Sequence, residues 1–229
     1  MNQPLITTIV AVRNGEQFLR DALDSILASD YPNVEIVLID GGSTDGTAAI
    51  AQSYPQVKYF AQEGKGIPDA YNQGVSEANG EWIAFLSHDD RWLPKKLSLQ
   101  AQYLSENEDH QLVVCRIQYF LETGCQIPSG FRPELLEGDH VAKIMETLLV
   151  RKNLFEEVGV FDTRYDIGED VDWYARVQDA GFEVPVLPEV LVHKRVHDHN
   201  SSIDVDKNNV ILLQVIRESI KRKQQQRDA

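Results

Sequence analysis

The sequence predicts an α/β fold in which a mostly parallel central sheet is flanked by helices. In the first half of the chain, short apolar runs rich in β-branched residues alternate with segments whose apolar residues recur at helical spacing, as βαβ units do. Two of the runs pass directly into acidic or glycine-rich segments, at Asp40 and at Ser87, and open parallel sheets bind ligands at such strand ends. The 229 residues fit one large domain with a modest extension.

Four strands and three helices are expected in the first half. The run 5–12 is apolar and almost uncharged, which is typical of a buried parallel strand. After it, Asn14 is a good N-cap and Gln17 completes a capping box for a helix that ends before Tyr31 and Pro32. The other expected strands are 34–40, 57–60 and 81–87, and the other expected helices are 47–53 and 67–78.

The second half predicts a smaller, mixed part. Its pattern indicates helices at 95–105 and 170–180, a helical turn at 152–158, and one amphipathic helix from about residue 205. The expected strands are 111–121, 146–150, 183–187 and 190–194.

Composition excludes several classes of protein. The apolar fraction of 42% and the charged fraction of 25% are ordinary for a soluble domain. A net charge of −14 argues against a nucleic-acid partner, which needs a basic face. No window approaches 18 apolar residues, and the N-terminus lacks the features of a signal peptide. With Cys115 and Cys125 as the only cysteines, a reduced, cytoplasmic protein is expected.

The acidic strand ends predict a metal and nucleotide site. The ends of parallel strands meet at one edge of the sheet, so 11–13, 40–42 and 87–90 should converge there. Asp89 and Asp90 are hard oxygen ligands, suited to Mg²⁺ or Mn²⁺ carrying a phosphate, although an Asp-Asp pair is more often simply solvated.

Asp40 has two interpretations. It can hydrogen-bond a base or ribose, or it can only cap the turn 41–43. The glycines at 41, 42 and 46 permit a ligand to approach the backbone closely.

Two later segments also carry polar groups of interest. The acids at 169, 170 and 172 open a helix, where they either stabilise the helix dipole or supply a general base. His197 and His199 are either surface residues or metal ligands. Lys194 and Arg195 can hold a pyrophosphate through charge-assisted hydrogen bonds.

Several motifs occur in a characteristic order. They are the opening segment 9–19 with 25–27 and 31–36, the segments 39–47, 64–74 and 85–90, Gly168-Glu169-Asp170 with Arg176, and Arg195-x-His197 with Ser201-Ser202. In that order the chain resembles a family-2 glycosyltransferase of the GT-A fold, over most of residues 5–202. The resemblance implies a single GT-A domain at 1–204, with a nucleotide-binding half at 1–110 and an acceptor-binding half at 111–204, followed by the C-terminal helix at 205–229.

The resemblance also implies an activity. It implies a metal-dependent, inverting transfer of a sugar from a nucleotide-sugar, often a UDP-sugar, to a hydroxyl of a saccharide or a lipid-linked saccharide, in polysaccharide or glycolipid assembly. Asp170 is then the catalytic base, and Mn²⁺ or Mg²⁺ is bound by Asp89, Asp90 and His197. The implied donor-binding residues are Ala11, Arg13, Asn14, Asp40, Gly41, Lys65, Asp69, Asn72, His88, Asp89 and Arg195.

Two departures from the family pattern keep alternatives open. Ser87 stands where the first acid of the D-x-D motif is expected, and Gly41 stands where many relatives have a second acid. One competing function is a non-catalytic nucleotide-sugar binding protein that lost its activity when Ser87 replaced an acid. The other is a sugar nucleotidyltransferase, a class with a similar sheet. The basic end of the C-terminal helix either contacts an anionic membrane from the cytoplasmic side or is the frayed end of a helix that packs on the core.

Overall fold

A mixed β-sheet organises the part of the chain that the structure describes, which in this computed structural model comprises residues 3–165, 167–198 and 205–227. Its strands are β1 (Ile6–Val12), β2 (Val34–Asp40), β3 (Val57–Ala61), β4 (Trp82–Ser87), β5 (Arg91–Trp92), β6 (Leu112–Leu121), β7 (His140–Val141), β8 (Leu149–Arg151) and β9 (Val186–Val196). Across the sheet the order is β3-β2-β1-β4-β8-β6-β9-β5, and β7 pairs with β6.

The three strands at the centre of the N-terminal half end together. β1 runs parallel to β2 and to β4, and its residues Val12 and Ala11 pair with Asp40 and Ser87, respectively. The carboxyl ends of these strands therefore lie at the same edge of the sheet, as the sequence predicts. Beyond β4 the direction changes, since β8 is antiparallel to both β4 and β6.

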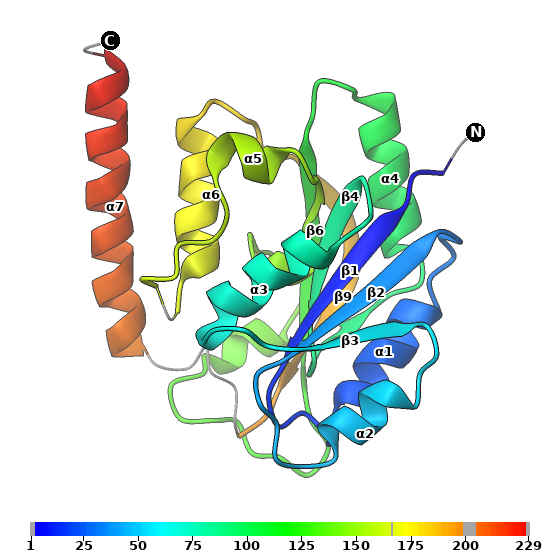
Figure 1. Ribbon diagram of the computed structural model, residues 1–229. Coiled ribbons are helices and arrows are strands. Elements are labelled where there is room, and N and C mark those ends of the chain that lie inside the picture. Colours follow the sequence, from blue (N-terminus) through cyan, green and yellow to red (C-terminus); the bar gives the residue numbers. More distant parts are fainter. Residues whose placement is uncertain (1–2, 166, 199–204, 228–229) are drawn as a thin grey trace.

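Helices cover both faces of this sheet (Figure 1). The helices are α1 (Leu19–Leu27), α2 (Thr47–Gln52), α3 (Gly66–Glu77), α4 (Lys96–Glu106), α5 (Leu154–Val158), α6 (Glu169–Asp179) and α7 (Val205–Arg227). Two short 3₁₀ turns lie at Pro133–Leu136 and Met145–Thr147. Apolar residues of α1, α2 and α4 form the core on one face, and those of α3, α5 and α6 form the core on the other. α7 packs outside α6, where Arg222 Nε donates to Asp179 Oδ2 at 2.8 Å.

An aromatic cluster fixes α6 against the sheet. Phe85 of β4 lies 5.7 Å from Phe161 between ring centroids, and Phe161 lies 6.0 Å from Trp173 of α6. Phe85 and Trp173 are fully buried. Because β4 leads into Asp89 and α6 begins at Glu169, this packing sets the distance between two acidic segments that are far apart in sequence.

The prediction that Asn14 caps the first helix is wrong. Phe18 is the N-cap of α1 and makes no side-chain capping hydrogen bond. Asn14 instead has a φ of 53°, a left-handed conformation that asparagine tolerates better than most residues. Its side chain accepts a hydrogen bond from Thr44 N, so it connects two loops.

The second half departs most from expectation. The two strands expected at 183–187 and 190–194 are one strand, β9, whose pairing with β6 is irregular around Pro188; a proline in a strand is accommodated at such an irregularity. The strand expected at 146–150 begins only at Leu149, after a 3₁₀ turn. β5 and β7 were not predicted, because two-residue strands show no periodicity.

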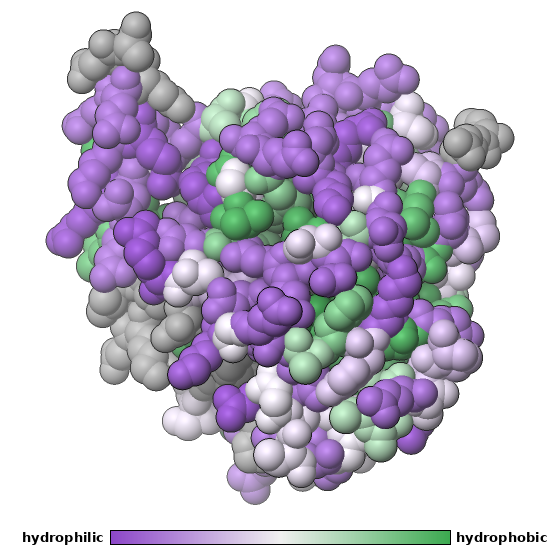
Figure 2. Space-filling model, viewed as in Figure 1, coloured by the Kyte–Doolittle hydropathy of each residue, from purple (hydrophilic) through white to green (hydrophobic). Residues whose placement is uncertain are grey.

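The face of the molecule shown in Figure 2, in the orientation of Figure 1, is mainly hydrophilic, and its apolar residues gather in limited areas. Within the described ranges, no helix combines the length and the apolar character that crossing a membrane requires.

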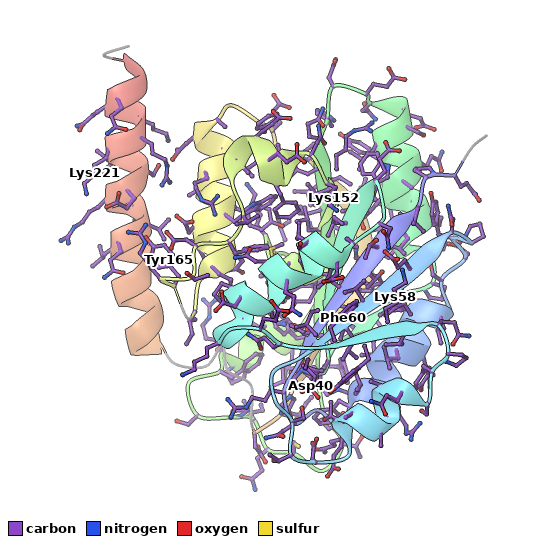
Figure 3. The ribbon with its side chains drawn as sticks, in the orientation of Figure 1. Asp40, Lys58, Phe60, Lys152, Tyr165 and Lys221 are labelled. Atoms are coloured by element: carbon purple, nitrogen blue, oxygen red, sulfur yellow. The ribbon has the colours of Figure 1, made fainter. Side chains whose placement is uncertain are left out.

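A buried carboxylate connects three strands to the end of α3. Glu35 of β2 accepts hydrogen bonds from Thr7 Oγ1 of β1 at 2.5 Å and from the backbone and side-chain nitrogens of Asn79 at 2.9 and 2.8 Å. It also pairs with Lys58 of β3, which Figure 3 labels. Burial alone raises the pKa of Glu35, but the hydrogen bonds from Lys58, Thr7 and Asn79 outweigh it and lower that pKa to about 2.

Replacing Glu35 by Gln should therefore destabilise the fold in a pH-dependent way. A carboxyl with a lowered pKa stabilises the folded state fully above its unfolded value near 4.5, and this contribution is lost as the pH falls towards 2. We expect urea unfolding at pH 7 to show a loss of about 1–3 kcal/mol that shrinks below pH 4.5. The exposed Glu77→Gln is the control, and an equal loss at pH 7 and pH 3 would contradict this account.

Candidate active site

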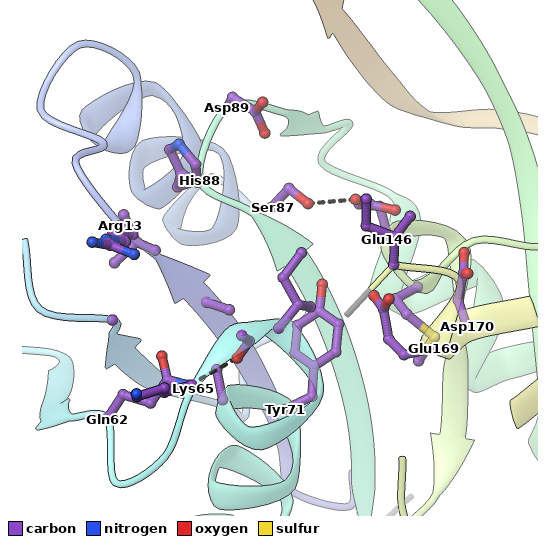
Figure 4. Close-up of a pocket in the computed structure, with 18 of the residues that line it drawn as sticks. Arg13, Gln62, Lys65, Tyr71, Ser87, His88, Asp89, Glu146, Glu169 and Asp170 are labelled. Carbon is purple, nitrogen blue, oxygen red and sulfur yellow. Dashed lines mark hydrogen bonds between the residues drawn. The ribbon is translucent and has the colours of Figure 1, made fainter. Parts of the chain in front are cut away.

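A pocket of about 780 Å³ opens where the strand ends converge (Figure 4). Its wall contains residues at the ends of β1, β2 and β4, the start of α3 and the N-terminus of α6. The volume is within the range of pockets that bind small molecules and cofactors. The position is the one where open α/β sheets place their ligands.

About half of the residues expected at the site line this pocket. Those that line it are Ala11, Arg13, Gly41, Lys65, His88, Asp89 and Asp170. Those that do not are Asn14, Asp40, Asp69, Asn72, Asp90, Arg195 and His197. His199, Ser201 and Ser202 lie outside the described residues.

Two loops form the wall at the ends of β1 and β2. Asn14 N donates to Ser43 Oγ at 2.8 Å, and Thr44 N donates to Asn14 Oδ1 at 2.8 Å. Gly42 has a φ of 78° and open space where a Cβ would stand, so the backbone there is accessible. Asn14 thus fixes the loop that carries Gly41 and Gly42 and does not itself line the pocket.

Asp40 has the role of a turn cap. Its Oδ1 accepts hydrogen bonds from Ser43 N at 2.8 Å and from Ser43 Oγ at 2.6 Å, and its Oδ2 accepts one from Tyr59 OH at 2.7 Å. The residue is 3% exposed. Of the two interpretations of Asp40, the structure therefore matches the turn cap and not the contact with a base or ribose.

Asp69 and Asn72 do not line the pocket and instead form hydrogen bonds with backbone groups of neighbouring segments. Lys65 N donates to Asp69 Oδ2 at 2.8 Å, which fixes the start of α3. The side chain of Asn72 bonds both backbone groups of Phe161, at 2.8 and 2.9 Å. Neither matches the expected contact with a donor, whereas Lys65 and Gln62 line the pocket (Figure 4).

Asp89 and His197 have the chemistry of a cation site. His197 Nε2 lies 3.1 Å from Asp89 Oδ2. Burial alone raises the pKa of Asp89, but His197, Lys194 and His88 together lower it, so it is a carboxylate at neutral pH. The described residues contain no group of three metal-binding side chains. Since Mg²⁺ and Mn²⁺ bound with phosphates often take only one or two protein ligands, this donor set fits a cation that arrives with a diphosphate.

Asp90 does not match the metal-ligand role predicted for it. It is fully buried, its Oδ2 accepts from Lys194 Nζ at 2.8 Å, and its Oδ1 accepts from Arg195 N at 2.8 Å. Both oxygens thus hold β9 against the segment that follows β4. A polar residue placed directly after a strand can point to either side, and the sequence does not distinguish the two.

Arg195 also points away from the pocket. Its guanidinium donates to the backbone oxygen of Asp89 at 2.8 Å and pairs with Asp21 and Glu122. It lies over the ring of Phe18 at 4.5 Å and is 3% exposed. Arg195 therefore fixes the backbone of Asp89 and is not positioned to bind a pyrophosphate directly. Its neighbour Lys194 lines the pocket instead.

Glu169 and Asp170, at the start of α6, are two adjacent carboxyls that line the same pocket. Burial raises the pKa of both, to about 8 for Glu169 and to about 6 for Asp170. Asp170 remains the more acidic, because Val171 N donates to its Oδ1 at 2.7 Å and Lys194 contributes a positive charge. The hydrogen bond from Val171 N and the charge of Lys194 both favour the ionised form of Asp170, and an ionised carboxylate is what a general base requires.

The sequence analysis missed Glu146, which lines the pocket between Asp89 and the acids of α6 (Figure 4). Its Oε1 accepts a hydrogen bond from Ser87 Oγ and one from Lys194 Nζ at 3.3 Å. The one signal available in the sequence was a single acid within the mainly apolar run 144–150. Its meaning depends on β8 pairing with β4, which local patterns do not reveal.

Comparison with known proteins identifies relatives along most of the chain. The family described as Glycosyl transferase family 2 matches residues 7–132. An uncharacterized glycosyltransferase of Rickettsia typhi is 33% identical over 214 residues, which cover 85% of this chain and 65% of that relative. The chain thus spans slightly less than two thirds of that relative's length.

Two solved structures share the architecture. Residues 1–349 of S. aureus TarS in complex with UDP-GlcNAc match with a TM-score of 0.74 at 20% identity, covering 95% of this chain and 66% of that one. The mannosyltransferase PcManGT from Pyrobaculum calidifontis, in complex with GDP-Man and Mn²⁺, matches with a TM-score of 0.72 at 22% identity, covering 96% of this chain and 65% of that one. At such identities the likeness establishes the fold, and the predicted GT-A fold is confirmed.

Proposed function

The chain belongs to glycosyl transferase family 2, and on that premise we propose that it transfers a sugar from a nucleotide-sugar donor to a hydroxyl group of an acceptor. The observation that carries the proposal is the arrangement of one pocket. Asp89 lines it at the carboxyl end of β4, and Asp170 lines it at the start of α6. A diphosphate at the first site and an acceptor hydroxyl at the second would place a transferred sugar between them.

The donor we propose is a nucleoside diphosphate sugar, with a UDP-sugar as the first candidate. Arg13 and Lys65 line the wall near the ends of β1 and β3 and carry the positive charge that phosphates need, in a chain of net charge −14. Similar folds in complex with UDP-GlcNAc and with GDP-Man and Mn²⁺ support this class of ligand. We further propose a saccharide or lipid-linked saccharide acceptor, as in polysaccharide or glycolipid assembly.

Asp89, with His197 beside it, would hold a divalent cation, Mn²⁺ or Mg²⁺. Such a cation neutralises the charge of the diphosphate leaving group. Asp90 is not included in this site, because both of its oxygens already bind β9.

The chemical step we propose is a single displacement. The acceptor oxygen attacks the anomeric carbon, the bond from that carbon to the diphosphate oxygen breaks, and its electron pair leaves with the diphosphate. Asp170 takes the proton from the acceptor hydroxyl. Attack from the face opposite the leaving group inverts the anomeric carbon, so the enzyme needs no covalent nucleophile.

Two other functions remain as competitors. A non-catalytic nucleotide-sugar binding protein would use the same pocket without turnover. A sugar nucleotidyltransferase needs a basic, glycine-rich phosphate loop directly after the first strand, and Arg13-Asn14-Gly15 is a poor substitute. The family match favours glycosyl transfer over both.

Replacing Asp170 by Asn should lower kcat for sugar transfer or donor hydrolysis by about 10²- to 10⁴-fold. The affinity for the nucleoside diphosphate should stay within about twofold, since the base acts only on the acceptor. A binding protein would instead show affinity without turnover in both forms.

The pH profile adds a second test of Asp170. The pKa of its carboxyl in the free enzyme is raised to about 6 and the base is the ionised form, so kcat/KM of the wild type should rise as the pH increases through about 6 and then level off. The groups that face this carboxyl are Glu169 on its own helix, with Glu146, Lys194, Tyr71 and Tyr174 opposite or beside it. A rate that falls between pH 5 and pH 7 would contradict the assignment.

Removing the Asp89 carboxylate should abolish the effect of metal on nucleotide binding. In calorimetric titrations of UDP and of GDP, we expect Mn²⁺ to raise the affinity of the wild type for at least one of them by tenfold or more, and Asp89→Ala to lose that gain. The exposed Asp109→Ala should behave as wild type. If Mn²⁺ strengthens binding equally in Asp89→Ala, the cation lies elsewhere.

We also propose that α7 contacts an anionic lipid surface. Leu213, Ile216 and Ile220 recur at helical spacing and are 57%, 45% and 51% exposed, whereas α7 turns Val215 inward. Arg217 and Lys221 are exposed on the same helix. An apolar stripe accompanied by basic residues is the pattern that binds the interface of an anionic membrane. Packing of α7 on α6 through Arg222 leaves this stripe uncovered by the described residues.

Sedimentation with vesicles tests this membrane contact. We expect the wild type to pellet with vesicles that contain phosphatidylglycerol and far less with pure phosphatidylcholine, and the double variant Ile216→Glu, Ile220→Glu to stay in solution. Val160→Glu changes an apolar residue that is 47% exposed elsewhere, so it serves as the control. Equal pelleting of the double variant, or no pelleting of the wild type, would exclude the contact.

A further inference from the structure

A charged network lies at the floor of the pocket, between Asp89 and Asp170. It consists of Ser87, Glu146 and Lys194, all of which line the pocket. Figure 4 shows the Ser87 hydroxyl directed at the Glu146 carboxylate, with Asp170 and Glu169 on the far side. The mechanism proposed above assigns these three residues no task.

Glu146 accepts three hydrogen bonds, yet one of its carboxylate oxygens takes part in none of them. Its backbone oxygen accepts from Trp92 Nε1 at 3.0 Å, and its Oε1 accepts from Ser87 Oγ and from Lys194 Nζ. Its side chain is 9% exposed. Among the described residues Oε2 has no hydrogen-bond partner, and it is not one of the buried, unsatisfied atoms, so it reaches the pocket space.

Lys194 presents a donor at the same place. An ammonium group has three N–H donors. Two of them are directed at Asp90 Oδ2, at 2.8 Å, and at Glu146 Oε1, at 3.3 Å. The third has no partner among the described residues, and Lys194 lines the pocket. A fixed acceptor and a fixed donor therefore lie side by side on the pocket floor.

This pair suits hydroxyl groups and disfavours phosphate. Lys194 is shared by two carboxylates, so the floor carries no excess positive charge, and Asp170 adds a further carboxyl nearby. A phosphate would be repelled by Glu146. A sugar hydroxyl is neutral and both donates and accepts, so it can donate to Glu146 and accept from Lys194.

We propose that Glu146 and Lys194 bind hydroxyl groups of the transferred sugar and thereby determine which sugar the pocket accepts. The inference rests on the proposed function, since it requires the diphosphate of the donor to lie beside Asp89. Ser87 is then a positioning residue, because its hydroxyl orients Glu146 without reaching the sugar. A sugar that lacks the matching hydroxyl would leave the Glu146 carboxylate without a hydrogen-bond partner, and a site built in this way discriminates strongly against such a sugar.

The test separates the sugar from the nucleotide. The probes are UDP and GDP, each with Mn²⁺, and their conjugates with glucose, galactose, N-acetylglucosamine and mannose, titrated by calorimetry. For Glu146→Gln we expect the Kd of the preferred sugar nucleotide to rise about tenfold, while the Kd of the matching nucleoside diphosphate rises less than twofold. Ser87→Ala should shift the same Kd in the same direction by a smaller factor, and its unfolding temperature serves to show that the variant is folded.

Arg13→Ala is the matched comparison, because Arg13 lies at the wall proposed for the diphosphate. This substitution should raise the Kd of the nucleoside diphosphate and the Kd of the sugar nucleotide by the same factor. Equal weakening of both ligands in Glu146→Gln, or no change in either, would overturn the sugar assignment while leaving the proposed function in place. If the wild type binds neither nucleoside diphosphate, the proposed function fails, and this inference fails with it.

Discussion

The structure depends on the register of β1 with its two parallel neighbours. Because Val12 pairs with Asp40 and Ala11 pairs with Ser87, the residues that follow three strands emerge at one edge of the sheet. The positions of the polar groups that follow these strands therefore depend on this pairing. A shift of one residue would turn the buried side chains of a strand to its other face, so the apolar core on both faces of the sheet also fixes the geometry of the pocket.

Hydrogen bonds and ion pairs of two buried residues, Asp90 and Arg195, then connect this edge of the sheet to other elements. Asp90 and Arg195 lie beside the pocket rather than in it, and both are bound to neighbours on other elements. Ions that are buried need such partners, since an unpaired buried charge costs several kcal/mol. These pairs attach β9 to the segment after β4, which keeps Asp89 in place. The residues that face the ligand and the residues that hold them thus alternate along the same short stretches of sequence.

That alternation explains how far the sequence could predict the site. The run 34–40, the convergence of the acidic ends and the helix that starts near Asp170 follow from local patterns, and the structure contains all three. Asp40 and Arg195 were expected to contact the donor, but the same residue types serve equally well as a turn cap and as a buried clamp. Glu146 was not expected, because its role arises from the pairing of β8 with β4, and pairing between distant strands leaves no periodic signal.

The central claim is that one pocket binds a divalent cation and a diphosphate at Asp89. Anomalous diffraction at the manganese edge, from crystals soaked with Mn²⁺ and UDP or GDP, tests it most directly. The account predicts a single strong peak in direct coordination contact with a carboxylate oxygen of Asp89, with the diphosphate between that peak and Lys65. A peak at the Asp90 carboxylate, or a nucleotide bound outside this pocket, would contradict it.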